Sequence, residues 1–199
     1  MSIAVFDYGA GNLHSLVKVL ERNSRSVRLE TDIRRAIDAD LLVLPGVGAF
    51  SAAAERLREG REVARVALRD GLPCLGICLG MQLLFDGSDE GAGEGLGVLT
   101  GRVTRLQAAR VPQIGWNSLE DVTDPLFARA ALRTAYYANS YVCRPADPSC
   151  VVAWSVHDGD RFPAAVRAGR VLGVQFHPEK SSAPGVSFVQ QFLSDIFPR

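Results

Sequence analysis

The chain has little of several features that would point to particular classes of protein. Its 22 lysine and arginine residues balance 22 aspartate and glutamate residues, so the formal net charge is zero. This balance argues against broad electrostatic binding of nucleic acid or of an anionic membrane surface. No apolar run approaches the roughly 20 residues of a membrane-spanning helix, and no basic segment of a signal peptide precedes the first apolar run. We therefore expect a cytoplasmic protein.

Cysteine and histidine are also scarce. The chain has three histidines and four cysteines, which are Cys74, Cys78, Cys143 and Cys150. The cysteines form no C-x-x-C pair and the histidines are scattered, so no metal-ligand pattern is present. A disulfide between Cys143 and Cys150 is disfavoured in a cytoplasmic protein. We expect no metal and no other cofactor.

Apolar segments alternate with helical patterns through the first half of the chain, which predicts a parallel sheet with right-handed crossovers. Strands are expected at 3–6, 26–29, 41–44 and 73–77, and helices from Asn12, at 33–37 and at 52–68. After a loop at 87–97, shorter strands are expected at 102–106, 136–142, 151–156, 164–167 and 171–176, and a final helix at 187–197. Turns at 158–159 and 168–169 predict antiparallel hairpins. We expect one α/β domain spanning 1–199.

One segment carries most of the chemical information: Gly76-Ile77-Cys78-Leu79-Gly80. It joins an expected buried strand to an apolar helical stretch, which predicts a sharp strand–turn–helix connection with a thiol at its apex. Such a turn holds the sulfur at the N-terminus of the helix, where the helix dipole favours the nucleophilic thiolate. We interpret Cys78 as an activated nucleophile, although a cysteine taken alone could be structural.

A second segment, at 173–180, offers a base for this nucleophile. His177 lies just past an expected strand, at the sheet edge where side chains of α/β proteins reach active sites. An imidazole can take and return a thiol proton near neutral pH. Glu179, two residues further on, can place a carboxylate on the same side of an extended chain and orient the imidazole. The sequence therefore predicts a Cys78–His177–Glu179 triad.

A third segment, Pro45-Gly46-Val47-Gly48, follows another expected buried strand. Acyl transfer through a tetrahedral intermediate needs N–H donors for the developing oxyanion. We expect the backbone N–H groups of Val47, Gly48 and Leu79 to form this oxyanion hole. If one peptide of this loop must turn over to aim an N–H at the oxyanion, Gly46 and Gly48 would lower the barrier to that rotation.

These three segments, in this order, resemble the class I (triad-type) glutamine amidotransferases. Within that family the resemblance is strongest to the glutaminase subunits of imidazole glycerol phosphate synthase, and it covers nearly the whole chain. It is carried by D-Y-G-A-G-N-L at 7–13, V-P-Q-I-G-W-N at 111–117, Y-Y-A-N-S-Y at 136–141 and Q-F-H-P-E-K-S at 175–181. The resemblance implies a flavodoxin-like fold, with a central, mostly parallel sheet, helices on both faces and an antiparallel C-terminal part.

The resemblance also implies a function. Glutamine would be hydrolysed through a cysteine thioester, and the ammonia would pass to a separate (β/α)8-barrel cyclase subunit in a heterodimer. That cyclase makes imidazole glycerol phosphate and aminoimidazole carboxamide ribotide in histidine biosynthesis, and its ligand activates an otherwise nearly silent glutaminase. The implied glutamine-binding residues are Gly46, Gln82, Ser140 and Tyr141, and the implied interface or coupling residues are Asn12, Trp116, Tyr136 and Lys180. Asn139 stands where the family often has histidine, so the strength of activation could differ.

Two alternatives remain open at this point. The first is a glutaminase that serves another synthase, such as one of the anthranilate or pyridoxal phosphate type, although the G-W-N and H-P-E-K-S segments argue against it. The second is a cysteine hydrolase, a chaperone-like protein of a related elbow-cysteine fold, or an inactive binding module. The position of Glu179, two residues after His177, argues against this second class.

Overall fold

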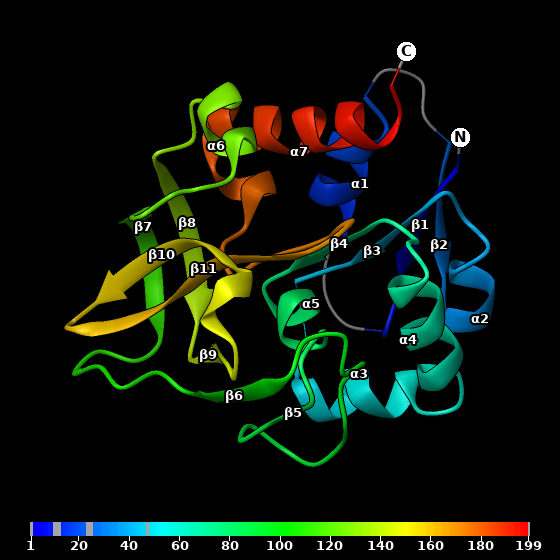
Figure 1. The fold of residues 1–199 in the computed structure, drawn as a ribbon, viewed down its shortest axis with the longest axis horizontal. Helices are drawn as coiled ribbons and strands as arrows, with labels where there is room; N and C mark the ends of the chain where they lie inside the picture. The colour runs from blue at the N-terminus through cyan, green and yellow to red at the C-terminus, as the bar shows by residue number, and fades with distance from the viewer. Residues whose placement is uncertain (1, 10–12, 23–25, 47, 199) are drawn as a thin grey trace.

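The computed structural model describes residues 2–9, 13–22, 26–46 and 48–198. Asn12, expected to open the first helix, and Val47, expected in the oxyanion hole, lie outside these residues. Within the described part, the fold is an α/β arrangement with one large central sheet and smaller β-structure at one side (Figure 1). None of the helices described there is long and apolar enough to cross a membrane.

The central sheet has seven strands among the described residues, in the order β10-β11-β12-β4-β3-β1-β2. The strands are β1 (Ser2–Phe6), β2 (Ser26–Glu30), β3 (Leu41–Leu44), β4 (Cys74–Ile77), β10 (Val151–His157), β11 (Asp160–Ala168) and β12 (Val171–Val174). The strands from β12 to β2 pair in parallel, whereas β10 and β11 pair antiparallel. This confirms the expected parallel sheet and its antiparallel C-terminal part.

Alternation along the strands separates two apolar cores, because successive side chains of a strand point to opposite faces of the sheet. In β1, Ile3 and Val5 belong to one core, and Ala4 and Phe6 belong to the other. The first core is covered by α1 (His14–Leu20), α6 (Pro125–Arg129) and α7 (Ser182–Ile196). The second is covered by α2 (Ile33–Ala36), α3 (Phe50–Leu57) and α4 (Arg61–Arg69). Helices therefore lie on both faces of the sheet (Figure 1).

The smaller β-structure follows the elbow helix α5 (Leu79–Gln82). A three-stranded sheet contains β5 (Gly87–Ser88), β6 (Gly101–Arg105) and β9 (Tyr141–Pro145). A two-stranded antiparallel ribbon, the β7–β8 ribbon, pairs β7 (Gln113–Ser118) with β8 (Thr134–Asn139). The single strand expected over 136–142 is therefore wrong, because the chain divides at Ser140 into two strands of different sheets.

Three further expectations differ from the structure. The helix expected over 52–68 is two helices, α3 and α4, because the chain leaves helical geometry before Gly60, a residue with low helix propensity that caps α4. The final helix begins at Ser182, earlier than expected. No strand was expected around Trp116, where the structure has β7, and no helix was expected where it has α6.

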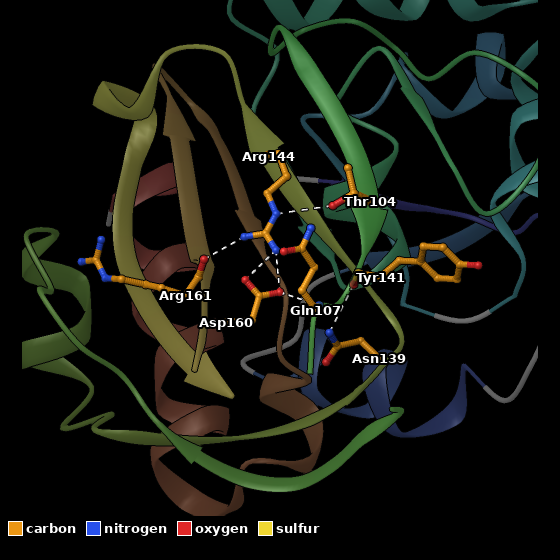
Figure 2. Close-up of polar contacts among 7 residues, drawn as sticks. All are labelled: Thr104, Gln107, Asn139, Tyr141, Arg144, Asp160 and Arg161. Carbon is orange, nitrogen blue, oxygen red and sulfur yellow. Dashed lines mark hydrogen bonds and ion pairs between the residues drawn. The ribbon is translucent and has the colours of Figure 1, made fainter. Parts of the chain in front are cut away.

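Arg144 of β9 connects the three-stranded sheet to β11 (Figure 2). Its Nη2 donates to both carboxylate oxygens of Asp160, at 2.7 and 2.6 Å, and its Nη1 donates to the Arg161 carbonyl at 2.7 Å. The Asp160 carboxylate, whose side chain is only 9% exposed, also accepts the Gln107 N–H at 2.7 Å. These charge-assisted hydrogen bonds from the Arg144 guanidinium to the nearly buried Asp160 carboxylate fix the position of β9. The same strand carries Tyr141.

We expect Arg144→Met to lower the free energy of unfolding by about 2 kcal/mol, because it leaves the nearly buried Asp160 carboxylate without its charged partner. Urea denaturation measures the change. The matched control is Arg129→Met, which breaks an exposed ion pair with Asp195 and should cost less than about 1 kcal/mol. Equal losses in the two variants would contradict this role of Arg144.

Candidate active site

Cys78 occupies a strained turn between β4 and α5. Its backbone has φ 47° and ψ −103°, a conformation that L-residues rarely adopt and that costs on the order of 1–3 kcal/mol. The Cys78 N–H donates to the Val174 carbonyl of β12 at 2.7 Å. A Cβ on Gly80 would lie 1.9 Å from the Leu44 carbonyl oxygen, so only glycine lets this turn pack on β3. The expected elbow at Cys78 is therefore present.

The helix after the elbow is shorter than the sequence indicates. The regular part of α5 covers only Leu79–Gln82, a single turn, and the chain then continues through a non-helical turn. A macrodipole is the sum of aligned peptide dipoles, so one turn supplies less of it than a long helix. We expected the helix dipole to stabilise the Cys78 thiolate, but with so short a helix the neighbouring side chains contribute more to this stabilisation.

His177 follows β12 and is 3% exposed. Its Nδ1 lies 2.8 Å from Glu179 Oε1, and its ring is also hydrogen-bonded to the Cys78 side chain. Burial lowers the pKa of His177, but the hydrogen bonds to Cys78 and Glu179 and the charges of these groups outweigh burial and raise the pKa to about 10. The structure thus brings the three expected residues together, with Glu179 in a short 3-10 helix (Pro178–Lys180) instead of an extended chain.

A cavity of about 280 Å³ opens beside Cys78. It is lined by Gly46, Gly48, Cys78, Leu79, Gln82, Glu90, Ala138, Asn139, Ser140 and Tyr141. These include every expected oxyanion-hole and glutamine-binding residue except Val47, which lies outside the described residues. A Cβ on Gly46 would lie 2.8 Å from His177 Cε1, so the loop after β3 closes directly on the imidazole.

Two residues of this site were missed by the sequence analysis. Glu90 lines the cavity, and its Oε2 accepts the Phe50 N–H at 3.2 Å. Gln175 is fully buried, and its Nε2 lies 3.5 Å from Cys78 Sγ. The sequence signals for these two residues are weak. Glu90 is one of several acids in or near the loop at 87–97, and Gln175 is one polar residue at the start of the Q-F-H-P-E segment.

Gln82 is held inside the cavity wall by two acceptors. Its Nε2 donates to the Tyr141 carbonyl at 3.1 Å and to Gln175 Oε1 at 3.4 Å. The same Tyr141 carbonyl accepts Nδ2 of Asn139 at 3.2 Å (Figure 2). The side-chain amides of Gln82 and Asn139 therefore join the cavity wall to the junction between β8 and β9.

The expected interface residues lie on the β7–β8 ribbon and next to the triad. Trp116 is 54% exposed and packs edge-on against Tyr136, with ring centroids 6.4 Å apart. Ile114, two residues before Trp116 on the same strand face, is 68% exposed. Lys180 is exposed beside Glu179, and Asn12 lies outside the described residues. Because the Tyr136 carbonyl accepts the His177 N–H at 2.8 Å, this ribbon contacts the triad directly.

The remaining cysteines are free thiols away from this cavity lining. Burial raises the pKa of the Cys74, Cys143 and Cys150 thiols, so these thiols are poor nucleophiles. Across the part of the chain that the structure describes, no group of three or more histidine, cysteine, aspartate or glutamate side chains could hold a metal ion.

Comparisons with known proteins identify the family. The family model described as "Glutamine amidotransferase class-I" matches residues 4–196. The protein named "Imidazole glycerol phosphate synthase subunit HisH" from Halobacterium salinarum is 43% identical over 202 residues, which cover 96% of this chain and 92% of the relative. The protein of the same name from Leifsonia xyli is 41% identical over 206 residues, with 98% of each chain covered.

Solved structures show the same fold at low sequence identity. The structure of PurLQS from Thermotoga maritima matches with a TM-score of 0.73 and 22% identity, covering 98% of both chains. A structure described as glutamine amidotransferase matches with a TM-score of 0.72 and 20% identity, covering 98% of this chain and 97% of the other. Since the family match extends over almost the whole chain, the protein belongs to the class-I glutamine amidotransferase family.

Proposed function

We propose that this chain is the glutaminase subunit of an imidazole glycerol phosphate synthase and acts in the cytoplasm as one domain over residues 1–199. The observation that carries the proposal is the His177–Glu179 contact of 2.8 Å beside the strained Cys78 turn. The relatives named as subunit HisH support the assignment to this synthase. In this proposal Cys78 is the nucleophile, His177 the acid and base, and Glu179 the residue that orients His177.

Acylation begins with glutamine in the cavity and its side-chain amide above Cys78. The thiolate attacks the amide carbon, and the oxyanion that forms is held by the N–H groups of Leu79, Gly48 and Val47. His177, whose raised pKa keeps it protonated near neutral pH, gives its proton to the departing nitrogen. The carbon–nitrogen bond breaks, ammonia leaves, and a glutamyl thioester remains on Cys78.

Deacylation reverses these roles. Neutral His177 takes a proton from a water molecule, which attacks the thioester carbon and forms a second oxyanion in the same hole. The carbon–sulfur bond breaks, glutamate leaves, and the thiolate–imidazolium pair is restored. Glu179 stabilises the imidazolium that is present before and after each turnover.

Recognition of glutamine depends on the cavity wall. The Glu90 carboxylate is the acidic group of the lining and suits the α-ammonium of an amino acid. Gln82, Gly46 and the Ser140–Tyr141 segment surround the remaining polar atoms of the substrate. This arrangement favours a small, zwitterionic amide substrate over a larger peptide.

The ammonia must reach an acceptor, because in water near neutral pH it is mostly ammonium. We assign the acceptor to a (β/α)8-barrel cyclase subunit that binds this chain as a heterodimer and makes imidazole glycerol phosphate and aminoimidazole carboxamide ribotide. The docking face would include Ile114, Trp116 and Tyr136, with Lys180 beside it, and Asn12 is a further candidate contact. Exposed aromatic side chains of this kind are typical anchors at protein interfaces.

Replacement of the nucleophile tests the proposed reaction. In the presence of the cyclase subunit and its ligand, Cys78→Ala should reduce glutamate release from glutamine by at least about a thousand-fold, because the thioester cannot form. The control is Cys150→Ala, which removes a half-buried thiol outside the cavity and should keep wild-type turnover. Near-wild-type turnover in Cys78→Ala would show that another residue is the nucleophile.

Two carboxylates near the site should have different kinetic roles. We expect Glu179→Gln to lower kcat by at least about ten-fold, because His177 loses its charged partner. Glu90→Gln should instead raise the KM for glutamine by roughly ten-fold, because the α-ammonium loses a charge-assisted hydrogen bond. Steady-state kinetics with both variants separates the roles, and a change in KM alone for Glu179→Gln would contradict the triad.

The raised pKa of His177 also predicts a pH dependence. Its contacts stabilise the folded chain fully below about pH 6.5, and this contribution is lost as the pH rises through about 10. In a titration of the imidazole followed by NMR, Glu179→Gln should therefore deprotonate at a lower pH than the wild type. Glu90→Gln should titrate like the wild type, and the opposite pattern would place the wrong carboxylate beside His177.

The docking face can be tested by binding. Trp116→Ala should weaken binding of the cyclase subunit by about 2 kcal/mol, roughly a 30-fold rise in Kd, because a large exposed anchor is removed. Val63→Ala is a matched control, since Val63 is 51% exposed on α4, far from the β7–β8 ribbon (Figure 1). If both variants bind like the wild type, the partner uses another surface.

A further inference from the structure

Gln175 is a fully buried side chain that lies between two residues of the proposed site. It follows the end of β12, two positions before His177, and is 0% exposed. Its Nε2 lies 3.5 Å from Cys78 Sγ, and its Oε1 lies 3.4 Å from Gln82 Nε2. A buried amide whose oxygen and NH₂ group both have partners has one defined orientation. That orientation determines which neighbour receives an N–H and which faces the oxygen.

A main-chain carbonyl determines the direction of these hydrogen bonds. The Tyr141 carbonyl can only accept, so Gln82 must turn its NH₂ group toward it. The second N–H of the same NH₂ group is then donated to Gln175 Oε1. With its oxygen facing Gln82, Gln175 must present its own NH₂ group to the sulfur of Cys78.

We infer that Gln175 is a positioning residue that donates an N–H to the Cys78 thiolate and fixes the Gln82 amide with its oxygen free for the substrate. A donor aimed at sulfur stabilises the charged form over the neutral thiol, which can itself donate. Both N–H groups of Gln82 are already used, so only its Oε1 remains to accept a hydrogen bond from a ligand in the cavity.

This inference rests on the proposed function, because it assumes that Cys78 reacts as a thiolate. Other titratable groups surround the sulfur. His177 is hydrogen-bonded to it, with Glu179 behind the imidazole, and Glu90 lines the same cavity. Burial and then the nearby Cys78 charge raise the pKa of Tyr8 and of Cys143. All these groups are retained when only Gln175 is changed, so a change in sulfur reactivity reports on Gln175.

The test is the rate at which iodoacetamide alkylates Cys78, measured between pH 5 and pH 10 by mass spectrometry of the Cys78 peptide. Gln175→Met removes the N–H donor with little change in side-chain volume. We expect alkylation near pH 7 to slow by roughly ten-fold, because one hydrogen bond to the thiolate is lost. The Gln175→Met rate should lie below the wild-type rate near pH 7 and approach it at the alkaline end of the range.

Gln113→Met provides a matched control. Gln113 is also a buried glutamine, 3% exposed, but its amide has no hydrogen-bond partner within the described structure. Its replacement should leave Cys78 alkylation at the wild-type rate at every pH. Gln175→Glu is a second variant, which keeps the size and an acceptor for Gln82 but faces the sulfur with a carboxylate. It should slow alkylation at least as much as Gln175→Met, so the test does not depend on the methionine variant alone.

The outcomes separate the two proposals. If Gln175→Met and Gln175→Glu alkylate within two-fold of wild type across the pH range, the donor role of Gln175 is wrong, while the triad can still turn over glutamine. If His177→Gln also leaves the pH dependence of alkylation unchanged, Cys78 and His177 do not act as a pair. The proposed function then fails, and the inference fails with it. Slower alkylation in both Gln175 variants, with Gln113→Met unchanged, establishes the positioning role.

Discussion

The site depends on one constraint: three neighbouring parallel strands end at the same edge of the sheet. β12, β4 and β3 are adjacent, and each is followed within three residues by one part of the site, namely His177, Cys78 and Gly46. Gly46 packs directly on His177, since a Cβ on Gly46 would lie 2.8 Å from Cε1 of the imidazole. The strained backbone of Cys78 persists because the strands on both sides hold the turn in place.

The β7–β8 ribbon is the second element that the site requires. Its Tyr136 carbonyl accepts the His177 N–H, and the Ser181 hydroxyl accepts the Tyr136 N–H at 2.9 Å and donates to the His177 carbonyl at 2.7 Å. At the other end of β8, Asn139 reaches the Tyr141 carbonyl that also holds Gln82. The ribbon that carries the exposed Trp116 is thus bonded to both halves of the site, so a partner that shifts it would change the geometry around His177 and Gln82.

The sequence predicted the parallel strands and the grouping of Cys78, His177 and Glu179 because both depend on local patterns: buried apolar runs, a G-x-C-x-G turn and a His-x-Glu spacing. It did not predict β7, because Gly115 and Asn117 are residue types that strands disfavour. It did not separate β8 from β9, because only Ser140 lies between the two strands, and no glycine or proline marks the point where the chain changes sheets. Glu90 and Gln175 were missed for another reason: only the fold brings them beside Cys78, and no local pattern records that contact.

The central claim is that this chain is a glutaminase whose activity depends on a cyclase partner. The most direct measurement is glutamate release from glutamine by the purified chain alone, with the cyclase subunit, and with the cyclase subunit plus its ribotide ligand. We expect little release by the chain alone, more with the cyclase subunit and most with the cyclase subunit and its ligand. High release by the chain alone would contradict the coupling to a partner, and no release in any mixture would contradict the proposed function itself.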